Sequence, residues 1–173
     1  MSANLRVLFS AEQIAARVAE LGREIRAAHP DQTLTVICVL KGSSLFMADL
    51  VRAIPGDVRL EFLGVASYHG GTSSSGAVQI TQDLRASIEG QACLIVEDIV
   101  DTGLTMDYLL RTLAVRGPRS LRVVSLLDKP GNREIEVAVD YVGFTIPDEF
   151  VVGYGLDLGE LYRNLPYVAV YVP

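Results

Sequence analysis

Hydrophobic residues along the chain follow two periods, one helical and one extended. Ser10 and Gln13 have the spacing of a helix capping box, and apolar residues then recur every three or four positions until Pro30. This pattern predicts a first helix between Ser10 and Pro30. The following run TLTVICVL, residues 33–40, is apolar on both faces, which is typical of a strand buried in a parallel sheet.

The same pattern of hydrophobic residues predicts two strand-loop-helix units. In the first, LKGSS is the loop and LFMADLVRAI the helix, which ends before Pro55. In the second, QACLIVEDI is the strand, DTGLT the loop and MDYLLRTLAVRG the helix, with Met106, Leu109, Leu110 and Leu113 on one apolar face. SLRVVSLL then predicts another buried strand. These alternating elements favour an α/β fold with an open, mostly parallel sheet that binds ligands at the carboxyl ends of its strands.

The remaining segments predict shorter strands and one loop without a core. VRLEFLGVASY and AVQITQDL have the composition of strands, and the intervening HGGTSSSG contains only small or polar residues that cannot pack a core. We therefore expect a mobile flap at about residues 67–78. YVGFTIP, FVVGYG and YVAVYV predict three further strands near the C-terminus, with no boundary for a second domain, so residues 1–173 form a single domain in this reading.

Composition narrows the classes of function. The net charge is -6 without any basic run, which argues against nonspecific nucleic-acid binding. Apolar runs are far shorter than the roughly 20 residues that span a bilayer, so we expect no membrane association and a cytoplasmic protein. Cys38 and Cys93 lie in apolar strands as small buried residues, and no cysteine or histidine spacing suits zinc.

The segment CLIVEDIVDTGLT contains the most informative polar residues. Glu97 and Asp98 end a hydrophobic strand, where two carboxylates can accept hydrogen bonds from vicinal ribose hydroxyls. The loop that follows contains Asp101 and Gly103, and the exposed N–H groups of the helix start can bind a phosphate. Each acid alone could equally be a solvated loop residue or a helix cap. Their close spacing favours a ligand, because mutual repulsion is usually offset by a cation or a polyhydroxyl group.

These ten residues, VEDIVDTGLT, resemble the phosphoribosyl pyrophosphate motif of the purine phosphoribosyltransferases, specifically the hypoxanthine-guanine branch. The resemblance extends from about Thr33 to Tyr171. LKGSS is similar to the pyrophosphate loop of the family, SYHGGTSSSG to its flexible catalytic loop, DKP to its purine-contacting segment, and residues 142–168 to its base-binding hood and C-terminal region. The resemblance implies the type I fold, a mostly parallel twisted sheet flanked by helices. It also implies a flexible β-flap and a small hood built from N- and C-terminal segments.

The resemblance further implies a role for each matching position. Glu97 and Asp98 would bind the ribose hydroxyls, and Asp101 would exchange a proton with the imidazole-ring nitrogen that becomes glycosylated. The residues expected around the 5-phosphate are Asp101, Thr102, Gly103, Leu104 and Thr105. Those expected at the pyrophosphate are Leu40, Lys41, Gly42 and Arg163, with a non-proline cis peptide between Leu40 and Lys41. Those expected at the purine are Ile99, Lys129, Phe150, Val151 and Asp157.

The same resemblance implies the cofactor, the substrates and the assembly. Mg²⁺ would be the metal, with Glu97, Asp98 and Asp157 as candidate ligands, since it prefers oxygen donors. Lys129 would favour a 6-oxopurine, hypoxanthine or guanine, by donating to its exocyclic oxygen. Ser67 and Tyr68 would begin the flap that excludes water, although His69 stands where a glycine is expected. A homodimer or homotetramer is implied because family members commonly associate.

Purely structural roles compete with the functional ones at four positions. They are Lys129 as a solvated turn residue, Phe150 as a core aromatic, Arg163 as a surface charge and Asp157 as a turn cap. Other functions compete for the whole chain. A regulatory nucleotide- or RNA-binding protein on this fold would need a basic face, which the sequence lacks. A xanthine-preferring or pyrimidine-specific transferase is disfavoured by DKP and DEFVVGYGLD. No Walker A, G-x-G-x-x-G or G-x-S-x-G motif supports a kinase, a dehydrogenase or a hydrolase.

Overall fold

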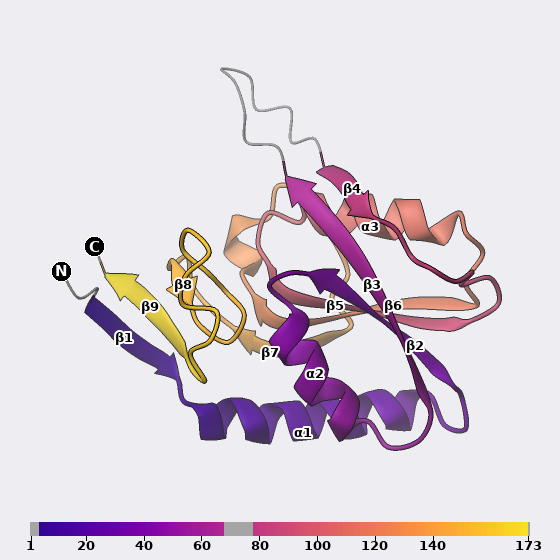
Figure 1. The fold of residues 1–173 in the computed structure, drawn as a ribbon, viewed down its shortest axis with the longest axis horizontal. Helices are drawn as coiled ribbons and strands as arrows, with labels where there is room; N and C mark the ends of the chain where they lie inside the picture. The colour runs from indigo at the N-terminus through magenta and orange to yellow at the C-terminus, as the bar shows by residue number, and fades with distance from the viewer. Residues whose placement is uncertain (1–3, 68–77, 173) are drawn as a thin grey trace.

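A mixed six-stranded sheet forms the centre of the molecule (Figure 1). The computed structural model describes residues 4–67 and 78–172. The strands lie in the order β4-β3-β2-β5-β6-β7, all neighbours being parallel except β3 and β4. Their bounds are β4 (Val78–Gln82), β3 (Val58–Ser67), β2 (Leu34–Leu40), β5 (Ala92–Val100), β6 (Ser120–Asp128) and β7 (Tyr141–Thr145). The predicted mostly parallel α/β sheet is confirmed.

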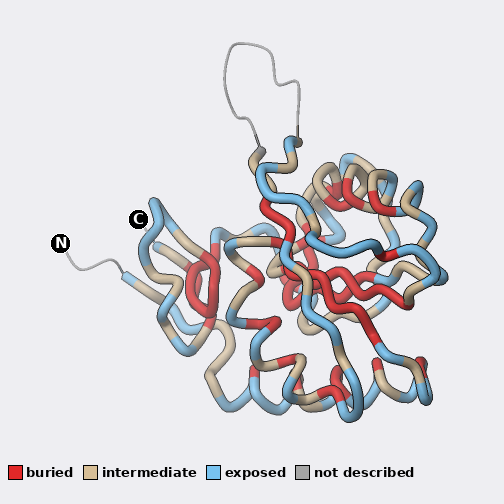
Figure 2. Tube along the Cα trace, turned by 45° about the vertical axis from the view of Figure 1, so that its right-hand side comes forward, coloured by how far each residue is buried: buried red, intermediate tan, exposed pale blue. Residues whose placement is uncertain are grey.

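Helices cover both faces of this sheet, and Figure 1 shows α1 along one side with α2 packed between it and the strands. α1 (Ala11–Ala28) and α2 (Ser44–Ala53) share one apolar core with alternate residues of β2, namely Leu34, Val36 and Cys38. α3 (Leu104–Ala114) packs on the opposite face, against Ile37 and Val39. The residues of β2 therefore alternate between two cores, which explains why its sequence is apolar on both faces. Figure 2 shows this buried band through the central strands.

A second, three-stranded antiparallel sheet lies beside the main one, and both ends of the chain run to it (Figure 1). It consists of β1 (Asn4–Phe9), β9 (Val168–Val172) and β8 (Val151–Val152). The pattern of NLRVLF did not predict β1, because most of its residues are exposed or only partly buried. We call this second sheet the hood sheet.

The start of α1 agrees with the sequence pattern, whereas the strands predicted from AVQITQDL and FVVGYG are longer than β4 and β8 in the structure. The predicted capping box at α1 is confirmed: Gln13 N donates to Ser10 Oγ at 3.3 Å and Ser10 N donates to Gln13 Oε1 at 2.8 Å. β4 ends at Gln82, two residues before the predicted strand end. β8 has only two residues because the chain turns at Gly153 and Tyr154, both of which have positive φ angles.

Side-chain burial matches most of the apolar faces that were predicted. Cys38 and Cys93 are free and buried, as expected of small strand residues. On α3, Met106, Leu109 and Leu113 are buried, whereas Leu110 is partly buried at the edge of the same core. Within residues 4–67 and 78–172, no helix is both long enough and apolar enough to cross a membrane.

Candidate active site

Two loops meet at the carboxyl ends of the neighbouring parallel strands β2 and β5. The β2 loop begins with a cis peptide between Leu40 and Lys41, which confirms the prediction for this bond. Gly42 lies directly against the end of β5: a Cβ atom at this position would come within 1.6 Å of Asp98 Oδ2. The lack of a side chain at Gly42 therefore allows the β2 loop to pack on the Asp98 carboxylate.

Glu97 and Asp98 form an acidic pair at the end of β5, with Glu97 buried and Asp98 half-buried. Burial raises the pKa of the Glu97 carboxyl well above its usual range, and the charge of neighbouring Asp98 raises it further. Burial also raises the pKa of Asp98, partly offset by hydrogen bonds, including one from Ile99 N to Asp98 Oδ1 at 2.8 Å. A cation or a set of hydroxyl donors would relieve the cost of ionising this pair.

The second loop, residues 101–103, leads into α3 and encloses a small cavity. Gly103 is the N-cap of α3 with φ 86°, a left-handed conformation that glycine adopts without strain. It carries no side chain to cap the helix, and Leu104 N, the first N–H of α3, donates to Thr102 Oγ1 at 3.4 Å. The other N–H groups of the first turn can bind an anion. The cavity has a volume of about 90 Å³. Its lining includes all of the predicted 5-phosphate residues except Leu104, the first residue of α3.

Asp101 and Lys129 face each other from the ends of β5 and β6. Lys129 is buried, with Nζ 3.8 Å from Asp101 Oδ2 and 3.4 Å from Asp148 Oδ1. Its burial excludes the interpretation of Lys129 as a solvated turn residue. Asp101 Oδ1 is buried and has no hydrogen-bond partner among the described residues. The arrangement presents a cationic donor beside an unsatisfied carboxylate oxygen.

Arg133 connects the loops of Asp101 and Lys129, and no sequence motif pointed to it. Its side chain is almost fully buried and pairs with Asp128. The other guanidinium nitrogen donates to the carbonyl oxygens of Val100 at 2.9 Å, Lys129 at 3.3 Å and Asp101. Arg133 thereby joins the two loops that carry Asp101 and Lys129. Its sequence signal is weak, an arginine four residues after a lysine in a turn.

Phe150, Val151 and Ile99 occupy different environments. Phe150 is 54% exposed and touches Tyr171 in an edge-to-face arrangement with ring centroids 6.3 Å apart, so it is not a core aromatic. Most of its ring surface remains open for stacking. Val151 is buried in β8, where it pairs with Val170, and Ile99 is partly buried at the end of β5.

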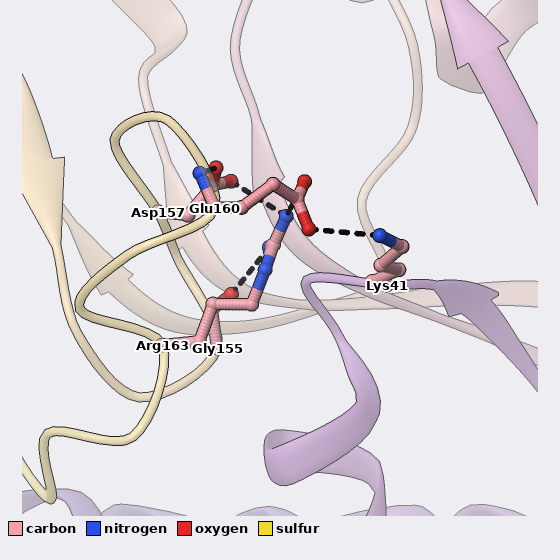
Figure 3. Close-up of polar contacts among 5 residues, drawn as sticks. All are labelled: Lys41, Gly155, Asp157, Glu160 and Arg163. Atoms are coloured by element: carbon pink, nitrogen blue, oxygen red, sulfur yellow. Dashed lines mark hydrogen bonds and ion pairs between the residues drawn. The ribbon is translucent and has the colours of Figure 1, made fainter.

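One cavity of about 350 Å³ is lined by Lys41, Arg163 and Glu160. Figure 3 shows Glu160 between the two cations, with Lys41 Nζ at 2.8 Å and Arg163 at 3.0 Å from its carboxylate oxygens. Arg163 further pairs with Asp157 at 2.8 Å and donates to the Gly155 carbonyl at 2.7 Å. Arg163 is therefore more than a surface charge. Glu160 was not singled out in the sequence, although it lies three residues from Arg163.

The three predicted metal ligands are not gathered into one site by the protein itself. Across the described ranges, no group of three or more histidine, cysteine or acidic side chains is placed to hold a metal. Glu97 and Asp98 are adjacent, whereas Asp157 is engaged by Arg163. Most of the predicted flap, including Tyr68 and His69, lies outside the described residues, and Ser67 is the last residue of β3.

Comparison with known proteins gives a consistent result. A family model described as a phosphoribosyl transferase domain matches residues 7–158. The chain is 54% identical to the hypoxanthine-guanine phosphoribosyltransferase of Mycobacterium avium, with 96% of this chain and 85% of that protein covered. It is 48% identical to the enzyme of that name from Bacillus subtilis, covering 97% and 93%. A crystal structure of a hypoxanthine phosphoribosyltransferase from Staphylococcus aureus superposes with a TM-score of 0.93 at 46% identity, covering 97% of this chain and 91% of that one.

Proposed function

The chain belongs to the phosphoribosyl transferase domain family, and on that premise we propose that it is a hypoxanthine-guanine phosphoribosyltransferase of purine salvage. The enzyme transfers the 5-phosphoribosyl group of phosphoribosyl pyrophosphate to a 6-oxopurine and releases pyrophosphate. The observation that carries this proposal is the pairing of buried Lys129 with Asp101, 3.8 Å apart at adjacent strand ends.

This pair can recognise and activate one edge of a purine. The Lys129 ammonium only donates hydrogen bonds, so it binds the exocyclic oxygen of hypoxanthine or guanine and rejects the amino group of adenine. Asp101 accepts the proton that the imidazole ring loses as the new bond forms. Its side chain is 45% exposed, so the carboxylate is accessible to a bound base. Exposed Phe150 supplies a stacking surface for the base, with Ile99 on the other side and the Val151 backbone at its edge.

The rest of the site suits the phosphoribosyl donor. Glu97 and Asp98 accept hydrogen bonds from the ribose hydroxyls, and the loop of Asp101 to Thr105 wraps the 5-phosphate at the start of α3. Lys41 and Arg163, with Leu40 and Gly42, receive the pyrophosphate. During transfer, the bond from the sugar carbon to the pyrophosphate oxygen breaks as the bond to the base nitrogen forms, and the proton passes to Asp101.

We infer that Mg²⁺ is the cofactor; its protein ligands would be Glu97 and Asp98, with Asp157, which is paired with Arg163, as a further candidate. The fit rests on the donor set: carboxylate oxygens are hard ligands, and burial of the pair favours a partner cation. When bound, Mg²⁺ neutralises the charge of the leaving pyrophosphate. We also propose a cytoplasmic homodimer or homotetramer, which would cover Leu60 and Phe62, both exposed on β3.

The test is nucleotide formation from phosphoribosyl pyrophosphate and Mg²⁺ with hypoxanthine, guanine, xanthine, adenine and uracil offered separately. We expect turnover with hypoxanthine and guanine only. Asp101→Asn is expected to lower kcat about 10²- to 10⁴-fold, the usual contribution of a positioned general base. Asp107→Asn, on α3 and paired with Arg111, is the matched control and retains activity. Turnover of none of the five bases would contradict the proposal, and a preference for xanthine would correct its substrate.

A further inference from the structure

The two cations assigned to the pyrophosphate are joined by a carboxylate of the protein itself. Glu160 Oε2 accepts from Lys41 Nζ at 2.8 Å, and Oε1 accepts from Arg163 at 3.0 Å (Figure 3). Lys41 comes from the β2 loop and Arg163 from a segment more than 100 residues later, so the two meet only in the folded chain. One carboxylate of the protein thus bridges the two positive groups that are expected to bind the pyrophosphate.

The backbone holds Glu160 at this place through a tight turn. Leu158 and Leu161 exchange two backbone hydrogen bonds of 3.2 Å, and the two residues between them, Gly159 and Glu160, have φ angles of 60° and 68°. Positive φ at both central positions defines a type I′ turn, in which glycine, asparagine and aspartate dominate. A glutamate in this left-handed conformation is uncommon and suggests a use for its side chain. Glu160 N also donates to Asp157 Oδ2 at 2.8 Å, which fixes the turn.

The ion pairs of Glu160 can be exchanged at low cost. The side chains of Lys41 and Glu160 are 68% and 63% exposed, so water compensates when the pair opens. The Arg163 side chain is 25% exposed and also pairs with Asp157, so it keeps an anionic partner when its pair with Glu160 opens.

We infer that Glu160 is an internal competitor of pyrophosphate: it occupies Lys41 and Arg163 when the site is empty, is displaced by the pyrophosphate group, and returns to help release it. The inference rests on the proposed function in so far as that function places pyrophosphate at these two cations. In this inference, the effect of Glu160 is to weaken the binding of pyrophosphate. A glutamate that merely positioned Lys41 would have the opposite effect, because its loss would weaken binding.

The test measures the dissociation constant of inorganic pyrophosphate with Mg²⁺ by titration calorimetry for the full chain and for Glu160→Gln. We expect affinity to rise about three- to tenfold in the variant, the range for losing two competing ion pairs, of which the pair with Lys41 is exposed and the pair with Arg163 partly exposed. The KM for phosphoribosyl pyrophosphate should fall by a similar factor. Binding of the nucleotide product, which lacks pyrophosphate, should be unchanged.

Two further variants separate charge from conformation. Glu160→Gly removes the same charge and suits a positive φ angle, so it should also tighten pyrophosphate binding. Glu24→Gln is the matched control, since Glu24 is likewise an exposed acid paired with an arginine, Arg17 at 2.9 Å, but lies on α1. Its pyrophosphate affinity should stay that of the wild type.

Unchanged or weaker pyrophosphate binding in both Glu160 variants would overturn the inference. Its failure is separable from that of the proposed function, because nucleotide formation by the wild type is scored independently. If the wild type makes nucleotide and Glu160→Gln binds pyrophosphate no better, only the inference fails. If the wild type makes no nucleotide yet Glu160→Gln binds pyrophosphate more tightly, the inference stands and the proposed reaction fails.

Discussion

Replacing Arg133 by methionine removes the connection between the loop of Asp101 and the loop of Lys129. Methionine keeps an unbranched apolar stem but donates no hydrogen bonds. The substitution would leave three backbone carbonyls without the guanidinium and would strip Asp128 of its cation. We therefore expect both lower stability and a defect in binding the base.

The size of the expected stability loss follows from the burial of the ion pair between Arg133 and Asp128. The side chains of Arg133 and Asp128 are only 7% and 12% exposed, so water cannot replace the lost partner. Removing one member of a buried pair usually costs about 3–5 kcal/mol. In a chain of this size each kcal/mol corresponds to roughly 2–4 °C in Tm. Arg133→Met should therefore lower Tm by about 6–20 °C.

The assay combines urea unfolding with steady-state kinetics. Arg111→Met is the matched control, because Arg111 is 74% exposed and pairs with Asp107 on the surface of α3. Its free energy of unfolding should change by no more than about 0.5 kcal/mol. In Arg133→Met at a temperature where it remains folded, KM for hypoxanthine should rise more than KM for phosphoribosyl pyrophosphate, since the residues that contact the base lose their common anchor.

A second substitution checks the electrostatic part of this reasoning. Adding Asp128→Asn to Arg133→Met removes the uncompensated charge and should restore part of the lost free energy of unfolding. Equal stability of Arg133→Met and Arg111→Met, together with an unchanged KM for hypoxanthine, would refute the role given to Arg133.

The other predictions concern close packing and pH. Gly42→Ala would place a Cβ atom 1.6 Å from Asp98 Oδ2, so it should raise KM for phosphoribosyl pyrophosphate while KM for hypoxanthine changes little; equal effects on both constants would contradict this. Burial raises the pKa of Cys93 to about 11 from about 9 in the unfolded chain, so the folded state retains the thiol proton at higher pH. The stability that this provides is present below pH 9 and is lost as pH rises towards 11. Urea unfolding at pH 8 and pH 10.5 should therefore show a smaller decline for Cys93→Ala than for the wild type, and identical declines would argue against it.

Much of the fold could be predicted because its signals are local. The capping box of Ser10 and Gln13 places the start of α1, and the apolar run of β2 indicates a strand buried on both faces. The hood sheet was harder to predict in its details. β1 is mostly exposed or partly buried, and its strand conformation depends on pairing with β9, more than 150 residues away. No local pattern encodes that pairing.

The sequence by itself determined the chemical groups at the end of β5 and in the loop that follows it. Glu97, Asp98 and Asp101 follow a strand, and Gly103 opens a helix, so their neighbourhood is fixed by a few bonds of chain. Tertiary structure alone decided which distant groups meet: Lys129 with Asp101, Arg133 across both loops, and Glu160 between Lys41 and Arg163. The physical reason is that ion pairs and hydrogen bonds depend on distance in space, which sheet order and tight turns set and which spacing along the chain does not reveal.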